Sequence, residues 1–288
     1  MPDNLPSDFI GYSPLSGHPL LSLSGADAVA FAHAQFSSDV AALPLRQWQW
    51  SAWLTAKGRT SAVFQLLKLA EDQILLVMPD ADADAIASQL QRFVFRRKVR
   101  VEVRNDLSVT ARFAAPEAAS GAAIAQFGAD GIELDMGSDA LPRSLRIGAV
   151  ADATAANGDD IDLAWRQSDL RYGVPRLDAA QREQWTPQQL GLDRLNGYSV
   201  KKGCYPGQEI VARTHFLGKA KRALQLLRVA DGTASGTQVL QNEAAIGTVA
   251  CVAGDLALAV LPLEIAAEPL AVAGVTATPL PLLDGLAR

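Results

Sequence analysis

The chain has 288 residues, of which 49% are hydrophobic and 20% charged, and its formal net charge is −5. This length predicts two domains or three small ones, and the apolar content is too high for intrinsic disorder. The acidic balance argues against a globally basic nucleic-acid binder. Two cysteines exclude a disulfide scaffold and a four-thiolate metal cage built by one chain.

The N-terminal stretch has no basic region followed by an unbroken apolar run, so we expect no signal peptide. No segment approaches the roughly 18 consecutive apolar residues that a membrane span needs. We therefore expect a cytoplasmic protein without a membrane segment.

The first third of the chain mixes helical and strand-like patterns. A helix is predicted over Ala26–Phe36, with Ser24 as its N-cap. The apolar runs Ser61–Leu69 and Gln73–Met78 are separated by three residues, which predicts a hairpin.

The middle of the chain continues with a helix predicted over Asp80–Arg96, acidic at its start and basic at its end. Lys98–Arg104 alternates valines with charges, as a half-buried strand does. Leu107–Ile147 mixes strand-like and helix-like runs. Helices are predicted over Asp159–Tyr172 and Pro187–Leu195. The order of elements predicts an α+β fold with a largely antiparallel sheet.

The last 70 or so residues read as short strands separated by turns, which predicts a terminal β-barrel or half-barrel. We expect the domain boundary between residues 220 and 221, giving domains 1–220 and 221–288. The predicted strands are Lys221–Ala230, Thr237–Leu240, Ala245–Ala250 and Leu256–Leu261.

The segment Lys201–Arg222 holds six basic residues and one acidic residue in a chain that is acidic overall. Glycines flank Cys204-Tyr205-Pro206, which predicts a tight turn with a close approach of backbones. Lys201 and Lys202 favour the thiolate form of Cys204 electrostatically if they lie beside it. The alternative is that Cys204 is a small buried hydrophobe and the lysines form a solvated face.

The other cysteine and the three histidines give no indication of a functional site. Cys251 lies in an apolar strand pattern and is expected to pack there. His18, His33 and His215 show no metal-ligand spacing, so no metal site is expected.

A second basic run follows the predicted helix over Asp80–Arg96. It fits a helix C-terminus and the exposed face of a strand, although an anionic ligand or a short RNA held between the two basic segments is the alternative. No nucleotide-binding glycine motif is present. The basic residues are Arg92, Arg96, Arg97, Lys98, Arg100 and Arg104, against the single acid Glu102.

The octapeptide Lys202–Glu209, KGCYPGQE, resembles the K-G-C-Y-x-G-Q-E signature of the YgfZ-type folate-binding proteins. These proteins are relatives of the glycine-cleavage aminomethyltransferases (GcvT). The similarity continues through Ile210–Arg213 and Gly218–Leu224, and more loosely at Leu23–Asp27 and Leu54–Arg59. Upstream, the family's W-R-x-x-D-[IL]-R-x-G-x-P pattern is matched by Trp165, Arg166, Asp169, Arg171, Gly173 and Pro175.

The resemblance implies a GcvT-like multi-domain α+β fold with a ferredoxin-like α+β part and a C-terminal β-barrel. It implies that the ligand is tetrahydrofolate or another folate. The implied role is an accessory protein for assembly or repair of iron–sulfur clusters, including those of tRNA-modifying enzymes. Its partners are then iron–sulfur client or assembly proteins, and direct RNA contact is not expected.

The resemblance also implies the functional residues. Cys204 is the signature cysteine, and Trp165 and Tyr205 offer flat surfaces to the pterin or aminobenzoate ring. The further folate-binding residues implied are Lys202, Gln208, Glu209, Arg213, Arg171 and Asp106.

Two positions separate this chain from its relatives. Arg171 stands where the aminomethyltransferases have a glutamate that anchors the pterin, and a cation cannot accept the pterin's donor hydrogen bonds. Asp106 resembles the aspartate that those enzymes place near the reactive nitrogen of the folate, although a turn residue before a strand is as good an interpretation. The alternative function is therefore a folate-dependent one-carbon transferase, in which Asp106 handles a proton.

Overall fold

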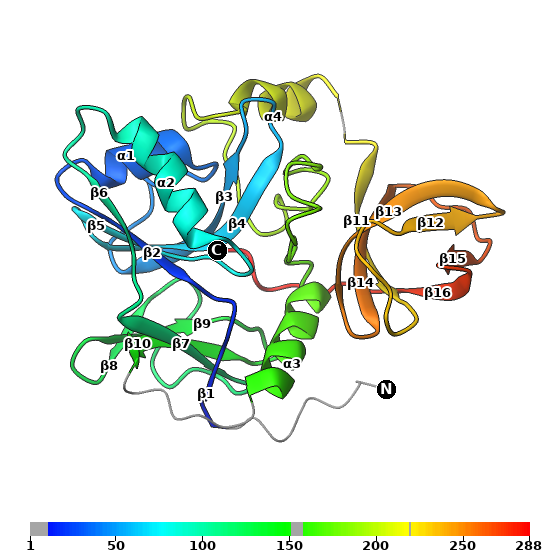
Figure 1. The fold of residues 1–288 in the computed structure, drawn as a ribbon, viewed down its shortest axis with the longest axis horizontal. Helices are drawn as coiled ribbons and strands as arrows, with labels where there is room; N and C mark the ends of the chain where they lie inside the picture. The colour runs from blue at the N-terminus through cyan, green and yellow to red at the C-terminus, as the bar shows by residue number, and fades with distance from the viewer. Residues whose placement is uncertain (1–10, 151–157, 219) are drawn as a thin grey trace.

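The computed structural model describes residues 11–150, 158–218 and 220–288. Two five-stranded antiparallel sheets lie at one end of the molecule and a closed β-barrel lies at the other (Figure 1). The α-helix α3, Gly158–Arg171, lies between the sheets and the barrel. The predicted α+β fold, with a ferredoxin-like part and a C-terminal barrel, is confirmed.

The first sheet carries the helices α1 (Ala28–Gln35) and α2 (Ala83–Val94) and forms the ferredoxin-like part. The hairpin predicted in the first third is confirmed as β4 and β5. Both predicted helices are present with shorter ends. The strand order is β3 (Gln47–Leu54), β4 (Thr60–Ala70), β5 (Gln73–Val77), β2 (Leu20–Ser24) and β6 (Arg100–Val103).

The predicted N-cap of the first helix is wrong. Ser24 is the last residue of β2, and the cap of α1 is Asp27. Gly25 separates them at φ +125°, where an added Cβ would lie 2.4 Å from the carbonyl oxygen of Lys98. The chain therefore turns tightly against the start of β6 before α1 begins.

Apart from one two-residue edge strand near the N-terminus, the second sheet is formed by the region of mixed pattern after residue 106. All of its regular elements are strands, because their apolar faces are buried against the first sheet and α3. The strand order is β1 (Ser13–Pro14), β7 (Leu107–Arg112), β10 (Ser144–Ala149), β9 (Gly131–Asp135) and β8 (Ala125–Phe127).

The helix predicted over Asp159–Tyr172 is confirmed as α3, whereas the one predicted over Pro187–Leu195 is wrong. Leu190 donates to the carbonyl of Thr186 as in a helix, but Gly191 adopts φ +62° and the bonding pattern breaks there. This segment is a series of turns. The helix α4 (Gln208–Phe216), which follows the signature turn, was not predicted from the sequence.

The four predicted C-terminal strands are confirmed, and two more close the barrel. The first of these two has three residues, too few for a recognisable pattern. In barrel order the strands are β11 (Arg222–Arg228), β14 (Leu256–Pro262), β13 (Ala244–Ala253), β12 (Gln238–Gln241), β15 (Leu270–Val272) and β16 (Val275–Leu280).

After the barrel the chain returns to the sheets (Figure 1). The indole of Trp50 in β3 donates to the carbonyl of Leu286 at 3.0 Å, and Arg194 pairs with Asp284 at 2.7 Å. One apolar core contains residues of both sheets, α3 and the barrel, among them Trp165 and Leu258. The described helices are all too short or too polar to cross a membrane.

Candidate functional site

The signature segment forms the predicted tight turn. Gly203 and Gly207 adopt φ +95° and +76°, and Gly207 is the N-cap of α4. Between them the thiol-bearing Cys204 is exposed. A Cβ on Gly207 would lie 2.6 Å from the Cα of Gly58 and 2.6 Å from the carbonyl oxygen of Thr55. The turn therefore packs directly on the β3–β4 turn, and the structure joins two of the segments on which the resemblance rests.

Lys202 and Tyr205 anchor this turn from inside. The ammonium of Lys202 donates to the carbonyls of His33 and Phe36 at the end of α1, and lies 4.7 Å from the centre of the Tyr205 ring. Burial lowers the pKa of Lys202 to about 8. The phenol of Tyr205 donates to the carbonyl of Ser199 at 3.0 Å, and burial raises its pKa.

These contacts show what the two residues do. His33 Nε2 donates back to the carbonyl of Lys202 at 3.0 Å, so the turn and α1 are bonded in both directions. The Lys202 ammonium is thus directed at α1, which is neither the position beside the Cys204 thiol nor the solvated face that the sequence left open. Lys202 and Tyr205 hold the backbone that presents Cys204.

The other signature residues lie on α4. Gln208 is half-buried in its first turn. Glu209 and Arg213 form an i,i+4 ion pair of 3.2 Å, with side chains that are 83% and 64% exposed. Such an exposed pair contributes little to stability, so both side chains are available to a ligand or a partner.

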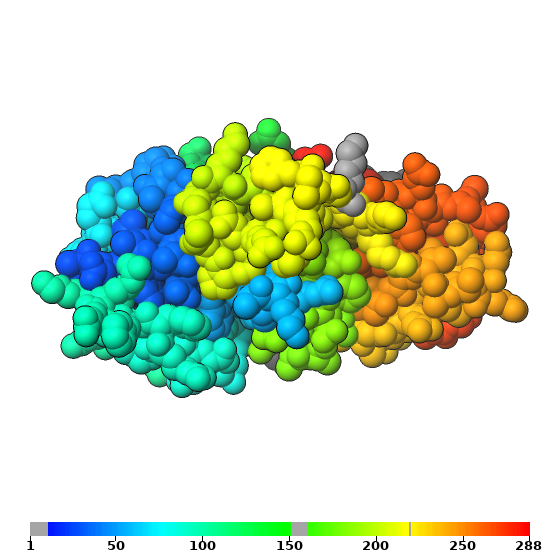
Figure 2. Space-filling model, turned by 90° about the horizontal axis from the view of Figure 1, so that it is seen from above, coloured from blue at the N-terminus to red at the C-terminus, as the bar shows by residue number. Residues whose placement is uncertain are grey.

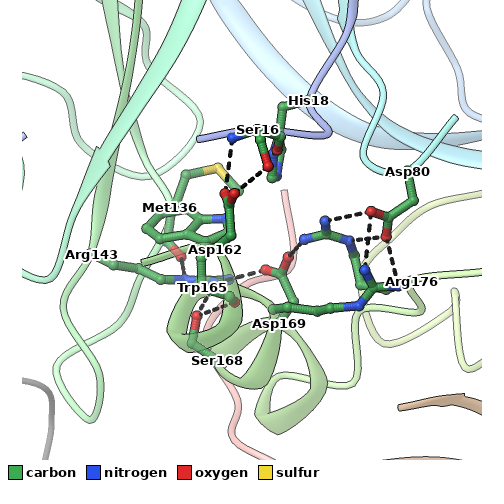
Figure 3. A network of polar contacts seen from close by, with 11 residues as sticks. Ser16, His18, Asp80, Met136, Arg143, Asp162, Trp165, Ser168, Asp169 and Arg176 are labelled. Atoms are coloured by element: carbon green, nitrogen blue, oxygen red, sulfur yellow. Dashed lines mark hydrogen bonds and ion pairs between the residues drawn. The ribbon is translucent and has the colours of Figure 1, made fainter. Parts of the chain in front are cut away.

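The second motif, on α3, builds a buried network of charges (Figure 3). The carboxylate of Asp169 lies 2.7 Å from Arg143 on one side and 2.7 Å from Arg176 on the other. Arg176 in turn donates to Asp80, which also pairs with Arg166 at 3.2 Å. The charges alternate along this chain of contacts, so each buried guanidinium or carboxylate has an opposite partner.

Trp165 packs against the Arg143 end of this network. Its ring is 1% exposed, with the guanidinium of Arg143 4.6 Å from its centre and the edge of Phe113 against it at 5.7 Å. The guanidinium of Arg143 also lies 4.8 Å from the ring of Tyr172. In this structure the ring of Trp165 therefore contacts protein side chains.

Asp80 is a site residue that sequence analysis missed. It lies in the turn between β5 and α2 at φ +59°, and its amide donates to the carbonyl of Gly17. Burial alone would raise its pKa, but the hydrogen bonds and charge of Arg176 outweigh this and lower it. A non-glycine residue at positive φ is unusual and draws attention to a position. The two arginines beside Asp80 are distant in the sequence, however, so only the fold reveals them.

A cavity of about 250 Å³ opens beside this network. Asp162 lines it and accepts from the backbone amide of Ser16 at 2.9 Å and from its hydroxyl. Two carboxylates and two guanidiniums therefore face one space, which offers both acceptors and donors to a polar planar ligand. The lining residues are Ser16, Gly17, Asp80, Asp162, Leu163, Arg166 and Arg176.

Comparison with known proteins identifies the family of the chain. No family model matches it. A protein of Yersinia pestis named "tRNA-modifying protein YgfZ" is 30% identical over 227 residues, which cover 72% of this chain and 68% of that protein. A protein of the same name from Colwellia psychrerythraea is 29% identical, over 73% and 69% of the two chains. The chain belongs to the YgfZ family.

The fold of this YgfZ-family protein is also GcvT-like. The glycine cleavage system aminomethyltransferase T of Bartonella henselae superposes with a TM-score of 0.73 over 95% of this chain and 85% of that one, at 17% identity. Since the identity is low, this similarity concerns the fold.

The remaining two candidate residues of the YgfZ-family chain lie apart from the signature turn. Arg171 is the last residue of α3, half-buried, and its carbonyl accepts from the amide of Leu283 at 2.8 Å. Asp106 follows β6, and the guanidinium of Arg104 donates hydrogen bonds to both of its carboxylate oxygens, at 2.8 and 2.6 Å. The hydrogen bonds from Arg104 lower the pKa of Asp106 to about 2.

A second cavity, of about 280 Å³, lies between α4 and the segment that follows α3. Thr214 and His215 of α4 line one side of it, and Gly173, just after α3, lines another. The two basic segments are not linked in this way: no hydrogen bond or ion pair joins them among the described residues.

Proposed function

We propose that this YgfZ-family protein binds a folate, such as tetrahydrofolate, and serves as an accessory protein in assembly or repair of iron–sulfur clusters. The clusters would include those of tRNA-modifying enzymes, and the partners would be iron–sulfur client or assembly proteins. Its membership of the family and the name "tRNA-modifying protein" carried by its relatives support this role.

The observation that carries the folate proposal is the cavity beside α3. A pterin ring has N–H donors on one edge and ring nitrogen and carbonyl acceptors on another. Asp80 and Asp162 supply acceptors for the donors, while Arg166 and Arg176 supply donors for the acceptors. These carboxylates provide the chemistry that Arg171 cannot provide at the position of the aminomethyltransferase glutamate.

The proposed site has two parts. Trp165 supports the cavity from behind, through the network of Arg143 and Asp169. Gln208, Glu209 and Arg213 lie on α4 and do not line this cavity. Their proposed part in folate binding therefore requires the long glutamate tail of the ligand to extend toward α4.

Isothermal titration calorimetry with tetrahydrofolate tests the site. Asp162→Asn removes a charged acceptor and is expected to weaken binding by about tenfold or more. Arg171→Glu tests the position at which the family patterns differ. Cys204→Ala is the matched control, expected to bind as the wild type does. If Asp162→Asn binds tetrahydrofolate with the affinity of the wild type, the folate site lies elsewhere. If the wild type binds no folate, the proposal is overturned.

Cys204 is the proposed functional thiol, through redox or transfer chemistry. It is exposed on a turn that Lys202 and Tyr205 hold in place, whereas Cys251 is buried in the barrel. Cys204→Ala is expected to abolish cellular activity while leaving the fold intact, and Cys251→Ala should retain activity. Full activity of Cys204→Ala would contradict a role for the thiol.

The alternative function is a folate-dependent one-carbon transferase. It requires Asp106 to handle a proton, yet its ion pair with Arg104 holds its pKa at about 2, which makes the carboxylate a weak base. Incubation with tetrahydrofolate and aminomethyl or methyl donors separates the two functions. Turnover would favour the transferase, and binding without turnover the accessory protein.

A further inference from the structure

The turn between α2 and β6 carries cations and phenylalanines that no contact with the rest of the protein accounts for. We name it the α2–β6 patch. All its members are exposed, while Val94 and Val99 are buried beneath them and fix the turn to the sheet. The patch consists of Arg92, Phe93, Phe95, Arg96, Arg97 and Lys98.

The two phenylalanines of the patch face solvent. Phe93 is 51% exposed and Phe95 is 86% exposed. Phe95 is the C-cap of α2 at φ +42°, a backbone conformation that bulky residues rarely adopt. The guanidinium of Arg96 lies over this ring, 5.2 Å from its centre. Phe95 therefore combines an exposed apolar ring with an unfavourable backbone conformation, and both are features of binding surfaces.

The cations of the patch are not neutralised. Among the described residues, the side chains of Arg92, Arg97 and Lys98 make no ion pair. The nearby acid Glu102 pairs instead with Arg100, at 3.4 Å. Asp27 accepts from the backbone amide of Lys98. The patch therefore presents a concentration of positive charge in a chain whose net charge is −5.

We propose that the α2–β6 patch binds single-stranded nucleic acid, which departs from the expectation of no direct RNA contact that the family resemblance gave. Unpaired nucleotides supply the two things that the patch lacks, a flat aromatic face for Phe95 and Phe93 and phosphates for Arg92, Arg97 and Lys98. Figure 2 shows the α2–β6 segment, in teal, at an edge of the molecule away from α4, in yellow. None of the six patch residues lines the proposed folate cavity, so the patch is a separate surface and its proposed role goes beyond folate binding.

Fluorescence anisotropy with a labelled uridine-rich RNA of about twelve nucleotides, and DNA of the same base order, tests this. Phe95→Leu is expected to weaken binding by about 5- to 100-fold, whereas Phe95→Trp retains it, because leucine keeps apolar area but cannot stack on a base. Replacing Arg92, Arg97 and Lys98 together by alanine should reduce the slope of log K against log salt by about 2. Arg46→Ala, at an exposed cation before β3, is the control that changes neither.

Several results would overturn the proposal. One is that the wild type binds neither oligonucleotide, and another is that Phe95→Leu binds as tightly as Phe95→Trp. Binding to phosphatidylserine-containing phosphatidylcholine vesicles instead of the oligonucleotides would identify a membrane-binding surface. Aggregation of the triple variant without nucleic-acid binding by the wild type would mean that the cations only protect the edge strand β6. Tetrahydrofolate binding, measured on the same variants, should be unchanged, so failure here is distinct from failure of the folate proposal.

Discussion

Gly207 and Gly58 meet backbone to backbone, since a Cβ on Gly207 would lie 2.6 Å from the Cα of Gly58. The contact joins the signature turn to the β3–β4 turn across a large sequence separation. A Cβ on Gly58 would in turn lie 2.8 Å from the Cβ of Ile210 in α4. The presentation of Cys204 therefore depends on two positions where no side chain fits.

Gly207→Ala should destabilise the protein by about 2–5 kcal/mol, because it adds both a steric collision and a residue at φ +76°. The matched control is Gly203→Ala. It has a similar positive φ, but nothing lies within 4 Å of its added Cβ, so only about 1–2 kcal/mol is expected. Urea unfolding of both variants measures the difference. Equal losses would mean that the contact with Gly58 is not tight.

Much of the architecture follows from local pattern. The hairpin of β4 and β5, the helices α2 and α3 and four barrel strands each have a period or a cap that their own residues supply. The turn at Gly203 and Gly207 could likewise be read from its glycines. The helix predicted over Pro187–Leu195 failed because one glycine at positive φ ended a regular bonding pattern.

The site was less accessible to sequence reasoning because its contacts are long-range. Asp80 bonds to Arg166 and Arg176, which lie 86 and 96 positions later in the chain. Lys202 bonds to His33, 169 positions earlier. No local pattern encodes such pairs, so Asp80 was missed, and neither interpretation of Lys202, beside the thiol or on a solvated face, included its contacts with α1.

Asp169→Asn should destabilise the protein by about 3–5 kcal/mol, because it leaves the buried guanidiniums of Arg143 and Arg176 without their shared carboxylate. Arg213→Ala breaks the exposed pair with Glu209 and should change the free energy of unfolding by no more than about 0.5 kcal/mol. Thermal and urea unfolding test both. Similar effects of the two variants would contradict a network that is closed to water.

His18 should make stability depend on pH. Burial and the charge of Arg176 lower its pKa from 6.5 to about 4, and its Nδ1 donates to the carbonyl of Ser16 at 2.6 Å. Between these two values the unfolded chain binds a proton that the folded chain does not. The free energy of unfolding therefore falls as the pH falls from 6.5 toward 4, and the effect levels off below 4.

His18→Gln removes this titration. Between pH 7 and pH 5 the wild type should lose about 2 kcal/mol more than the variant, as measured by urea unfolding at each pH. His33 and His215 are present in both proteins, so their contributions cancel in the comparison. Parallel pH profiles would show that His18 titrates normally in the folded state.

The two cysteines should differ sharply in reactivity. Cys204 is exposed between two glycines, whereas Cys251 is 1% exposed in β13 and burial raises its pKa to about 11. An aromatic disulfide reagent needs both access and thiolate, so the native protein should release one equivalent of chromophore quickly. That equivalent should vanish in Cys204→Ala and persist in Cys251→Ala, and unfolding the wild type should expose the second. Fast release of two equivalents from the native protein would mean that the barrel admits the reagent.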